Sequence, residues 1–213
     1  MPLTLSSPDD SPTAARRKRE IADAARAELI EKGVEGLRMR AIAERAGINI
    51  ATLHYHAKGK EGLIGLVAAS IADDFMEQRN RTPRDDWTGL KQLIQELKDF
   101  RDLRNARPDI HPLMASLSRR APSDANIAQF IDPMNAAWER KLQAIMERGR
   151  ADGSLRASID PLASSRLYIF TVIAVGSHGR DPIEFPAIAC ELLRAFAMDP
   201  TQNFERLLDE RDS

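Results

Sequence analysis

The sequence predicts an all-α protein, and three observations support this fold class. Ala, Leu, Ile, Glu and Arg together make up about half of the 213-residue chain, and these side chains lose little conformational freedom in a helix. Only 5% of the residues are aromatic. Apolar residues recur at helical spacing in both halves of the chain, as in the stripe of Leu90, Leu93, Ile94, Leu97 and Phe100.

The first part of the chain predicts a tail followed by one long helix. Residues 1–13 hold three prolines among serines and aspartates without an apolar period, so we expect a disordered tail there. The first helix is expected over residues 14–32. Gly33 follows it, and glycine is the residue type that ends a helix in a left-handed conformation at least cost.

Two short helices and a longer one are expected next, over residues 39–46 and 50–56 and from about Lys60 to Asn80. Asn49 precedes the second short helix, where its side-chain oxygen can accept a hydrogen bond from an unsatisfied backbone amide. Ile42-Ala43, Gly47 and Leu53 have the spacing of a helix-turn-helix, in which Gly47 permits the tight turn and Ile42, Ile48 and Leu53 fill the angle between the helices.

The second half continues the helical period. Pro108 and Pro112 mark a break before a short helix. Asp132-Pro133 is either an N-cap with a first-turn proline or a kink ahead of the next apolar stripe. Residues 151–158 predict a loop, and the last helices are expected over residues 161–176, 184–198 and 201–209.

The segment from Ile169 to Val175 is rich in β-branched residues and also fits a buried strand. Sixteen residues from Pro161 to Gly176 contain no internal breaker, and no second candidate strand is present to pair with, so we predict a helix. A helix that is apolar nearly all round is covered on two sides. The second cover is most simply a second subunit.

Charge is distributed unevenly along the chain, although its net charge is only −1. Residues 14–60 carry eleven Lys or Arg against six Asp or Glu, whereas the remainder is acidic. A basic end joined to an acidic body indicates a polyanionic partner. The predicted second helix of the helix-turn-helix has small and hydrogen-bonding side chains, which suit entry into a DNA major groove.

Residues 16–64 resemble the DNA-binding domain of the TetR family of bacterial transcriptional regulators. The stretches that carry the resemblance are Ile21-Ala-Asp-Ala-Ala25, Gly33-Val-Glu-Gly36, Arg40-Ala-Ile-Ala-Glu-Arg-Ala-Gly-Ile48, and Ala51-Thr-Leu-His-Tyr-His-Ala-Lys-Gly-Lys-Glu61 with Leu63. The resemblance implies a helix-turn-helix domain over residues 14–60 and a helical effector-binding and dimerisation domain over residues 61–213.

The resemblance also implies which side chains contact DNA. Thr52 and Tyr55 are expected at base edges, with Ile50 and Ala51 lining the groove. The remaining expected contacts are polar or basic groups suited to the phosphate backbone or to the edge of the site: Arg38, Arg40, Asn49, His54, His56 and Lys60.

Three positions depart from the family pattern. His54 stands where a tyrosine is usual, Ala57 replaces a bulky apolar residue, and Arg38 occupies a position where a Thr or Ser cap is common. These departures leave the operator sequence unpredictable by analogy. His54 and His56 are poor metal ligands, because a spacing of two on a helix points their side chains apart.

For the second domain, the resemblance implies a small-molecule cavity and a four-helix dimer interface. The candidates for the cavity are large or polar-tipped residues on inward stripes: Phe100, His111, Met114, Met134, Trp138 and Tyr168. The candidates for the interface belong to the last two long helices: Leu162, Ile169, Phe170, Ile173, Ile188, Leu192 and Phe196.

Several other classes of protein are disfavoured. Cys190 is the only cysteine, which excludes an internal disulfide and a cysteine-rich zinc module. No phosphate loop, nucleophile elbow or metal triad is present, so we expect neither an enzyme nor a bound cofactor or metal. Apolar runs are too short to span a bilayer and no signal peptide is evident, so we expect a cytoplasmic protein.

The sequence thus predicts a homodimeric DNA-binding regulator, with repression of a palindromic operator as the default and release by a small-molecule effector. The alternative is an all-helical ligand carrier or adaptor that does not bind DNA.

Overall fold

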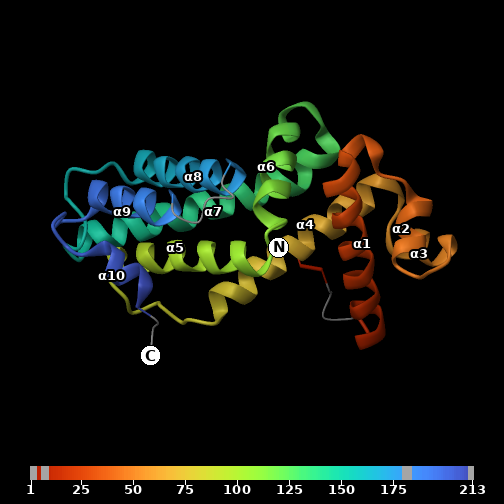
Figure 1. Ribbon diagram of the computed structural model, residues 1–213, viewed down its shortest axis with the longest axis horizontal. Helices are drawn as coiled ribbons and strands as arrows, with labels where there is room; N and C mark the ends of the chain where they lie inside the picture. Colours follow the sequence, from red (N-terminus) through yellow and green to blue (C-terminus); the bar gives the residue numbers. More distant parts are fainter. Residues whose placement is uncertain (1–3, 6–9, 179–183, 211–213) are drawn as a thin grey trace. The chain divides into compact units, whose positions relative to one another are not determined.

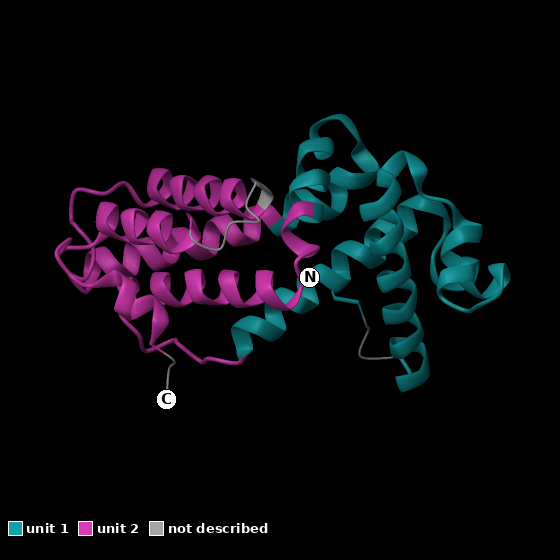
Figure 2. Ribbon diagram, in the orientation of Figure 1, with its two compact units in different colours: residues 1–80, 113–134 teal, residues 81–112, 135–213 magenta. Residues whose placement is uncertain are grey.

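The computed structural model describes residues 4–5, 10–178 and 184–210, with Ser177 and His178 described by backbone only. The described residues are almost entirely helical, and their one β-type pairing is an isolated bridge between Leu155 and Ala197 (Figure 1). The predicted all-α class is therefore confirmed. The chain divides into two compact units: residues 1–80 with 113–134, and residues 81–112 with 135–213 (Figure 2).

Unit 1 contains the helix-turn-helix. Its helices are α1 (Pro12–Gly36), α2 (Met39–Arg45), α3 (Ile50–His56) and α4 (Gly59–Asn80), to which residues 113–134 add most of α6 (Ile110–Arg120), a short 3₁₀ turn (Ala121–Ser123) and the start of α7 (Ala125–Ala151). α1 packs on α4 and α2. The side chains of Ile21, Leu37 and Ile71 in this unit are fully buried.

α1 begins two residues earlier than the sequence predicts. Ser11 accepts a hydrogen bond from the Ala14 amide at 3.2 Å, and Pro12 occupies the first turn, where its missing N–H is not needed. Gly33 adopts φ 67°, as expected for a glycine that ends a helix, and one further turn follows it.

The expected tail over residues 1–13 is not disordered where the structure describes it. Leu5 is 3% exposed and packs with Ala22, Leu66 and Ala69. Its backbone N–H donates to Asp73 Oδ2 at 3.2 Å. Composition does not reveal this contact, because the partners of Leu5 lie on α1 and α4.

Unit 2 is a helical bundle with its own core. It contains α5 (Gly89–Ala106), the first residues of α6, the larger part of α7, α8 (Pro161–His178), α9 (Glu184–Phe196) and α10 (Phe204–Asp209). The fully buried Leu93, Leu97 and Leu193 lie in its centre. Residues 161–176 form a helix as predicted, and the alternative of a buried strand is wrong.

Pro133 lies inside α7, so the alternative of an N-cap at Asp132 is wrong. The helix begins at Ala125 instead, directly after Asp124, whose carbonyl accepts hydrogen bonds from the amides of Ile127 and Ala128. A proline within a helix removes one backbone donor, and the exposed position of Pro133 lessens the cost because water can bond the carbonyl left unpaired.

Candidate nucleic-acid interface

The turn between α2 and α3 has the geometry that the sequence predicts. Gly47 has φ 64°, in the left-handed region that favours glycine. Its amide donates to the Glu44 carbonyl at 3.1 Å, and the Ile48 amide donates to the Ala43 carbonyl at 2.9 Å. Leu53 is fully buried and Ala43 is 4% exposed, so the two short helices close on a common apolar contact.

The residue before α3 caps the helix, and the residue after it is buried. Asn49 Oδ1 accepts a hydrogen bond from the Thr52 amide at 2.7 Å, which confirms the predicted N-cap. Ala57, which follows α3, is 1% exposed. A Cβ added at Gly62 would lie 3.1 Å from the Ala57 carbonyl carbon. Because α4 approaches Ala57 this closely, this arrangement leaves no room for a bulky side chain at position 57.

Ion pairs fix α1 against the two helices that it touches. The Arg45 guanidinium of α2 binds Glu28 at 3.2 Å and Glu31 at 2.7 Å. Glu28 is nearly buried, and hydrogen bonds from Lys32 and Arg45, together with their charges, hold its pKa below the usual value despite the opposing effect of burial. Arg26, 3% exposed, binds Asp74 of α4 at 2.7 Å. α2 is therefore held in place by charge as well as by packing.

The outer face of α3 presents the side chains that the sequence predicts as groove contacts. Tyr55 is 84% exposed and Ile50 is 39% exposed. Thr52 is half-buried, whereas the other predicted contacts Ala51, His54, Arg40 and Lys60 are exposed. The exposure of these side chains leaves this face of α3 accessible to a partner.

Two residues predicted to contact DNA interact with other residues of the protein in the structure. The Arg38 guanidinium donates to the carbonyl oxygens of Glu35 at 2.6 Å and Leu37 at 3.1 Å. His56 is half-buried, and its ring meets that of Tyr55 edge-on, with centroids 5.0 Å apart. Burial lowers the pKa of His56, and the charges of Lys18 and Arg17 lower it further, so the imidazole is neutral near pH 7.

The basic residues at positions 16–19 were not among the predicted contacts, although the charges of Arg17 and Lys18 influence His56 at the end of α3. The signal in the sequence was four consecutive cations in the excess of positive charge over residues 14–60. A search confined to the helix-turn-helix could not assign them, because residues 16–19 precede the start of α3 by more than thirty positions in the sequence.

Part of the predicted effector site is a stack of rings in unit 2. The rings of Phe100 and His111 lie 4.0 Å apart between centroids, and Phe185, which the sequence did not indicate, stacks on Phe100 at 5.6 Å. Gly176 packs directly against this stack, since a Cβ there would lie 2.9 Å from the Phe100 ring. Burial lowers the pKa of His111 to about 4.

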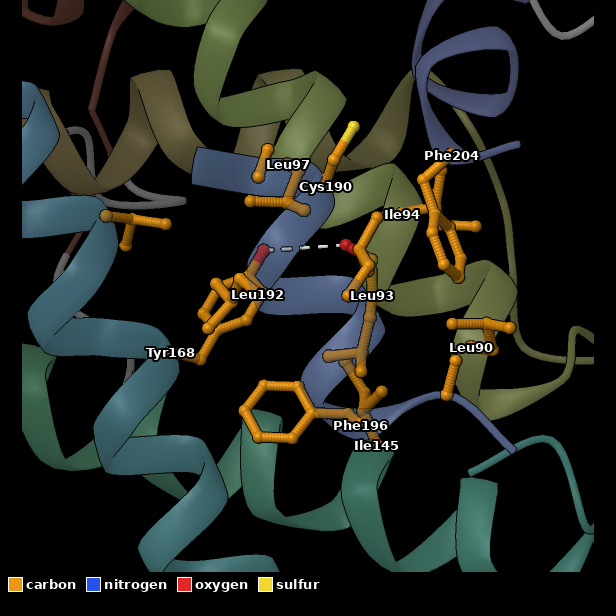
Figure 3. Close-up of a cluster of buried hydrophobic side chains, with 14 of the residues drawn as sticks. Leu90, Leu93, Ile94, Leu97, Ile145, Tyr168, Cys190, Leu192, Phe196 and Phe204 are labelled. Atoms are coloured by element: carbon orange, nitrogen blue, oxygen red, sulfur yellow. Dashed lines mark hydrogen bonds between the residues drawn. The ribbon is translucent and has the colours of Figure 1, made fainter. Parts of the chain in front are cut away.

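Tyr168 and Trp138 belong to the main core of unit 2 rather than to this stack. Tyr168 is 1% exposed, and its hydroxyl donates weakly to the Leu93 carbonyl at 3.5 Å (Figure 3). Trp138 is partly buried against the same core. The half-buried Met114 and Met134 are in unit 1, so the six predicted cavity residues do not form one cluster within a single unit.

The predicted dimer residues separate into two groups. Phe170 is 67% exposed, and Leu162, Ile169, Ile173 and Ile188 are half-buried. By contrast, Leu192 and Phe196 are 6% and 3% exposed because they face the core of unit 2 (Figure 3). We therefore remove Leu192 and Phe196 from the proposed interface and add Leu167, which is 50% exposed.

Comparisons with known proteins agree with this geometry. Residues 21–67 match the family described as bacterial regulatory proteins, tetR family. The regulatory protein RaaS of Mycobacterium tuberculosis is 27% identical over 64% of this chain, and this chain spans 58% of the length of RaaS. The repressor KstR2 of Mycolicibacterium smegmatis is 26% identical, with 72% of this chain and 74% of KstR2 covered.

The fold of the whole chain has solved counterparts. AibR, whose crystal structure is in complex with isovaleryl coenzyme A and operator DNA, superimposes with a TM-score of 0.70 at 20% identity, covering 85% of this chain and 98% of AibR. The helix-turn-helix lies within the segment that matches the family, and the helical unit that follows has the same fold as solved regulators. Residues 21–67 therefore carry the helix-turn-helix segment of the tetR family of bacterial regulatory proteins, and the helical units of the chain have the fold of solved regulators.

Proposed function

We propose that this protein is a homodimeric, DNA-binding transcriptional repressor of the bacterial cytoplasm, without catalytic activity of its own. The observation that carries the proposal is the outer face of α3, where an 84%-exposed tyrosine stands beside small side chains on a rigidly capped helix. A helix of this size fits the major groove, and its first residues can reach base edges.

The charges of unit 1 support a polyanionic partner over a neutral one. Arg40 and Lys60 are exposed on either side of α3 in the sequence, and phosphate contacts from such groups fix the position of a reading helix on the duplex. Among the described residues no helix has both the length and the apolar character needed to cross a membrane. Within the same residues, no group of three potential metal ligands is present.

The proposed mechanism couples DNA binding to occupancy of unit 2. A dimer places two copies of α3 about one DNA turn, ~34 Å, apart or a multiple of it, so the operator is a near-palindrome. An effector that binds better to the form in which α3 cannot fit both half-sites shifts the population toward that form. A differential affinity of about 1.4 kcal/mol changes occupancy tenfold.

The first effectors to test are acyl coenzyme A thioesters. AibR, which has the same fold, is described with isovaleryl coenzyme A, and unit 2 of this chain offers aromatic and aliphatic side chains that suit an acyl group. Isovaleryl coenzyme A and a longer-chain thioester, added to the protein–DNA complex, are expected to lower the DNA affinity. If free coenzyme A has the same effect, the acyl group is not recognised.

The DNA-binding proposal is tested by selecting bound duplexes from a random pool and measuring affinity for the recovered site. Thr52→Ala and Tyr55→Ala are each expected to weaken binding by about 1–3 kcal/mol, which is about 5- to 150-fold. Met198→Ala removes a side chain that is 64% exposed in unit 2 and should leave the affinity unchanged.

Two results would contradict the proposal. Recovery of no enriched sequence by the full-length, folded protein would favour the alternative of a ligand carrier or adaptor. Equal affinity of the Tyr55→Ala and Thr52→Ala variants and the wild type for an enriched site would place the DNA contact elsewhere than α3.

A further inference from the structure

Four consecutive cations lie near the start of α1, at positions 16–19. Arg16 and Arg19 are exposed, and the Arg16 side chain retains 70% of its accessible surface. Glu20 binds Arg17 at 2.6 Å and lies 3.8 Å from Arg16. One carboxylate is thus shared by two guanidinium groups, and this part of the surface has an excess of positive charge.

The third cation has a carboxylate partner from the preceding segment. Lys18 Nζ lies 2.6 Å from Asp10 Oδ2, and both side chains are mostly covered, at 22% and 17% exposure. Upstream, the chain is anchored by the burial of Leu5 against α1 and α4 and by the hydrogen bond from its amide to Asp73. Leu5 and Asp10 are therefore both held on unit 1, the first by packing and the second by its ion pair with Lys18.

This basic surface is close to the reading helix. Lys18, Arg17 and Asp10 all act electrostatically on His56, the last residue of α3. His56 in turn contacts the ring of Tyr55, the most exposed large side chain on that helix. Because His56 is itself neutral near pH 7, the positive charge beside the end of α3 comes from Lys18 and Arg17 of α1 together with the exposed Lys58 and Lys60 that follow α3 (α1 and α3 in Figure 1).

We propose that residues 16–19 of α1 bind the phosphate backbone of the same duplex whose groove receives α3, and that the Asp10 carboxylate holds Lys18 until a phosphate replaces it. This inference rests on the proposed function and adds a second contact surface to it. A phosphate oxygen carries the same charge as the carboxylate, so it can take over the ammonium group without a new binding geometry.

Asp10 also has a physical effect on unspecific binding. A carboxylate that stays beside the basic surface repels phosphates, and its displacement has a cost that DNA contacts elsewhere must offset. The cost is the same for every duplex that displaces Asp10, so it lowers the affinity for unspecific DNA and for the operator by the same factor. The Asp10–Lys18 pair therefore weakens DNA binding in general, and contacts of α3 with base edges supply the discrimination.

The first experiment measures the salt dependence of binding to a duplex of about 30 base pairs recovered by selection. Each phosphate contact contributes about 0.9 to the slope of log K against log salt. The double variant Arg16→Gln with Arg19→Gln is expected to lower the slope by about 2 and to weaken binding most at low salt. An unchanged slope overturns the proposed contact.

The matched control is Arg206→Gln. Arg206 is 76% exposed and pairs with Glu210 at a spacing of four residues, just as the 70%-exposed Arg16 lies near Glu20 at that spacing. Arg206 also carries a guanidinium group but lies on α10 of unit 2. The Arg206→Gln variant should therefore have the same slope of log K against log salt as the wild type. An equal loss of slope in this variant would show a general charge effect and would also overturn the proposal.

The second experiment tests the role of Asp10. Asp10→Asn is expected to bind DNA about fivefold more tightly at low salt, the effect of one unit charge near a phosphate in water, and the gain should vanish at high salt. The gain should be about the same for a random duplex and for the selected site, because the cost of displacing Asp10 does not depend on the base sequence. Glu210→Gln serves as the control, and unchanged or weaker binding by Asp10→Asn overturns the competitor role.

Failure of this inference is distinguishable from failure of the proposed function. If the wild type binds no duplex, both fail. If the wild type binds the selected site and Tyr55→Ala weakens that binding, but the α1 variants keep the wild-type slope, the proposed function stands and the second contact surface is rejected. Thermal unfolding of each variant establishes that the protein is folded in every comparison.

Discussion

His111 is a titratable side chain enclosed by rings, and its environment determines its charge. It is 8% exposed, lies 4.0 Å from the Phe100 ring between centroids and accompanies Phe185 in the stack. Burial disfavours the imidazolium, and a hydrogen bond with the Phe100 backbone only partly opposes this effect, so its pKa falls to about 4. His111 therefore stays neutral throughout the physiological range.

This pKa predicts a pH dependence of stability. The pKa of histidine in the unfolded chain is about 6.5, so between that pH and pH 4 the unfolded state binds the proton more tightly. The free energy of unfolding should therefore fall as the pH falls through this window, by roughly 3 kcal/mol in total from this residue.

Denaturant unfolding between pH 7 and pH 4 checks this prediction. His111→Gln should be less stable at pH 7 and show a flatter pH dependence, whereas Phe185→Leu should lose stability without flattening it. An unaltered pH dependence in His111→Gln would mean that the imidazole is accessible to protons in the folded protein.

For single residues, the sequence predicted which side chains are buried better than it predicted which of them contact one another. Its stripes indicated that Phe100, His111 and Tyr168 point inward, which the structure confirms. Helical periodicity does not specify which inward residues meet, because this depends on how helices distant in the sequence pack. Phe185 was missed for this reason: it is one of several apolar residues on α9, and only the packed bundle places it on Phe100.

The helix-turn-helix is the element whose geometry depends most on single residues. Gly47 has φ 64°, and a Cβ added there meets nothing within 4 Å, so the cost of a side chain at this position is backbone strain alone. An L-residue in this conformation is strained by about 1–2 kcal/mol, and asparagine tolerates it better than alanine.

Gly47→Ala should therefore lower the free energy of unfolding by about 1–2 kcal/mol, and Gly47→Asn by less. Urea denaturation of both variants measures the difference. Equal losses in the two variants would contradict the strain argument, since steric crowding rather than backbone conformation would then be the cause.

The helix-turn-helix was predictable because its signals are local. Asn49 and Gly47 act within four residues of their own positions, as cap and turn, and Leu53 packs between two helices that are adjacent in the sequence. Leu5 illustrates the opposite case: its burial depends on side chains that lie between 17 and 64 positions later in the chain. Composition therefore predicted a tail where the structure has an anchored segment.

At the scale of the whole molecule, α8 carries two of the large apolar side chains that are exposed among the described residues. Phe170 and Leu167 are 67% and 50% exposed, and their neighbours Ile169 and Ile173 are half-buried. The sequence predicted that this helix is covered on two sides, and unit 2 supplies one cover through Tyr168 and Val172, which are buried in its core. A second subunit is the proposed cover for the other side.

The dimer proposal predicts the effect of a charge on this face. Phe170→Glu should convert the dimer to a monomer, because an unpaired carboxylate in an apolar interface has a large desolvation cost. Sedimentation equilibrium measures the change in mass, and Met198→Glu, at another exposed apolar residue, should leave the mass unaltered. A Phe170→Glu variant that remains dimeric would place the interface elsewhere.

The sequence could not separate the two faces of the last helices. Both faces of α9 carry apolar side chains, and the interface implied by the family resemblance included Leu192 and Phe196 together with Ile188. Packing in unit 2 buries Leu192 and Phe196 and leaves Ile188 partly accessible. Which apolar face is internal depends on the neighbouring helices, and this information is not local.

The central claim is that α3 enters the groove of DNA, and tethered cleavage tests it most directly. Cys190 is the only cysteine and is 1% exposed, so a cysteine introduced at the exposed Ala51 of α3 can carry a DNA-cleaving reagent selectively. We predict cuts centred on each half-site of the selected duplex, and none from the same reagent at Ala137→Cys, an exposed position of α7. Full binding without cleavage from position 51, or equal cleavage from both positions, would contradict the claim.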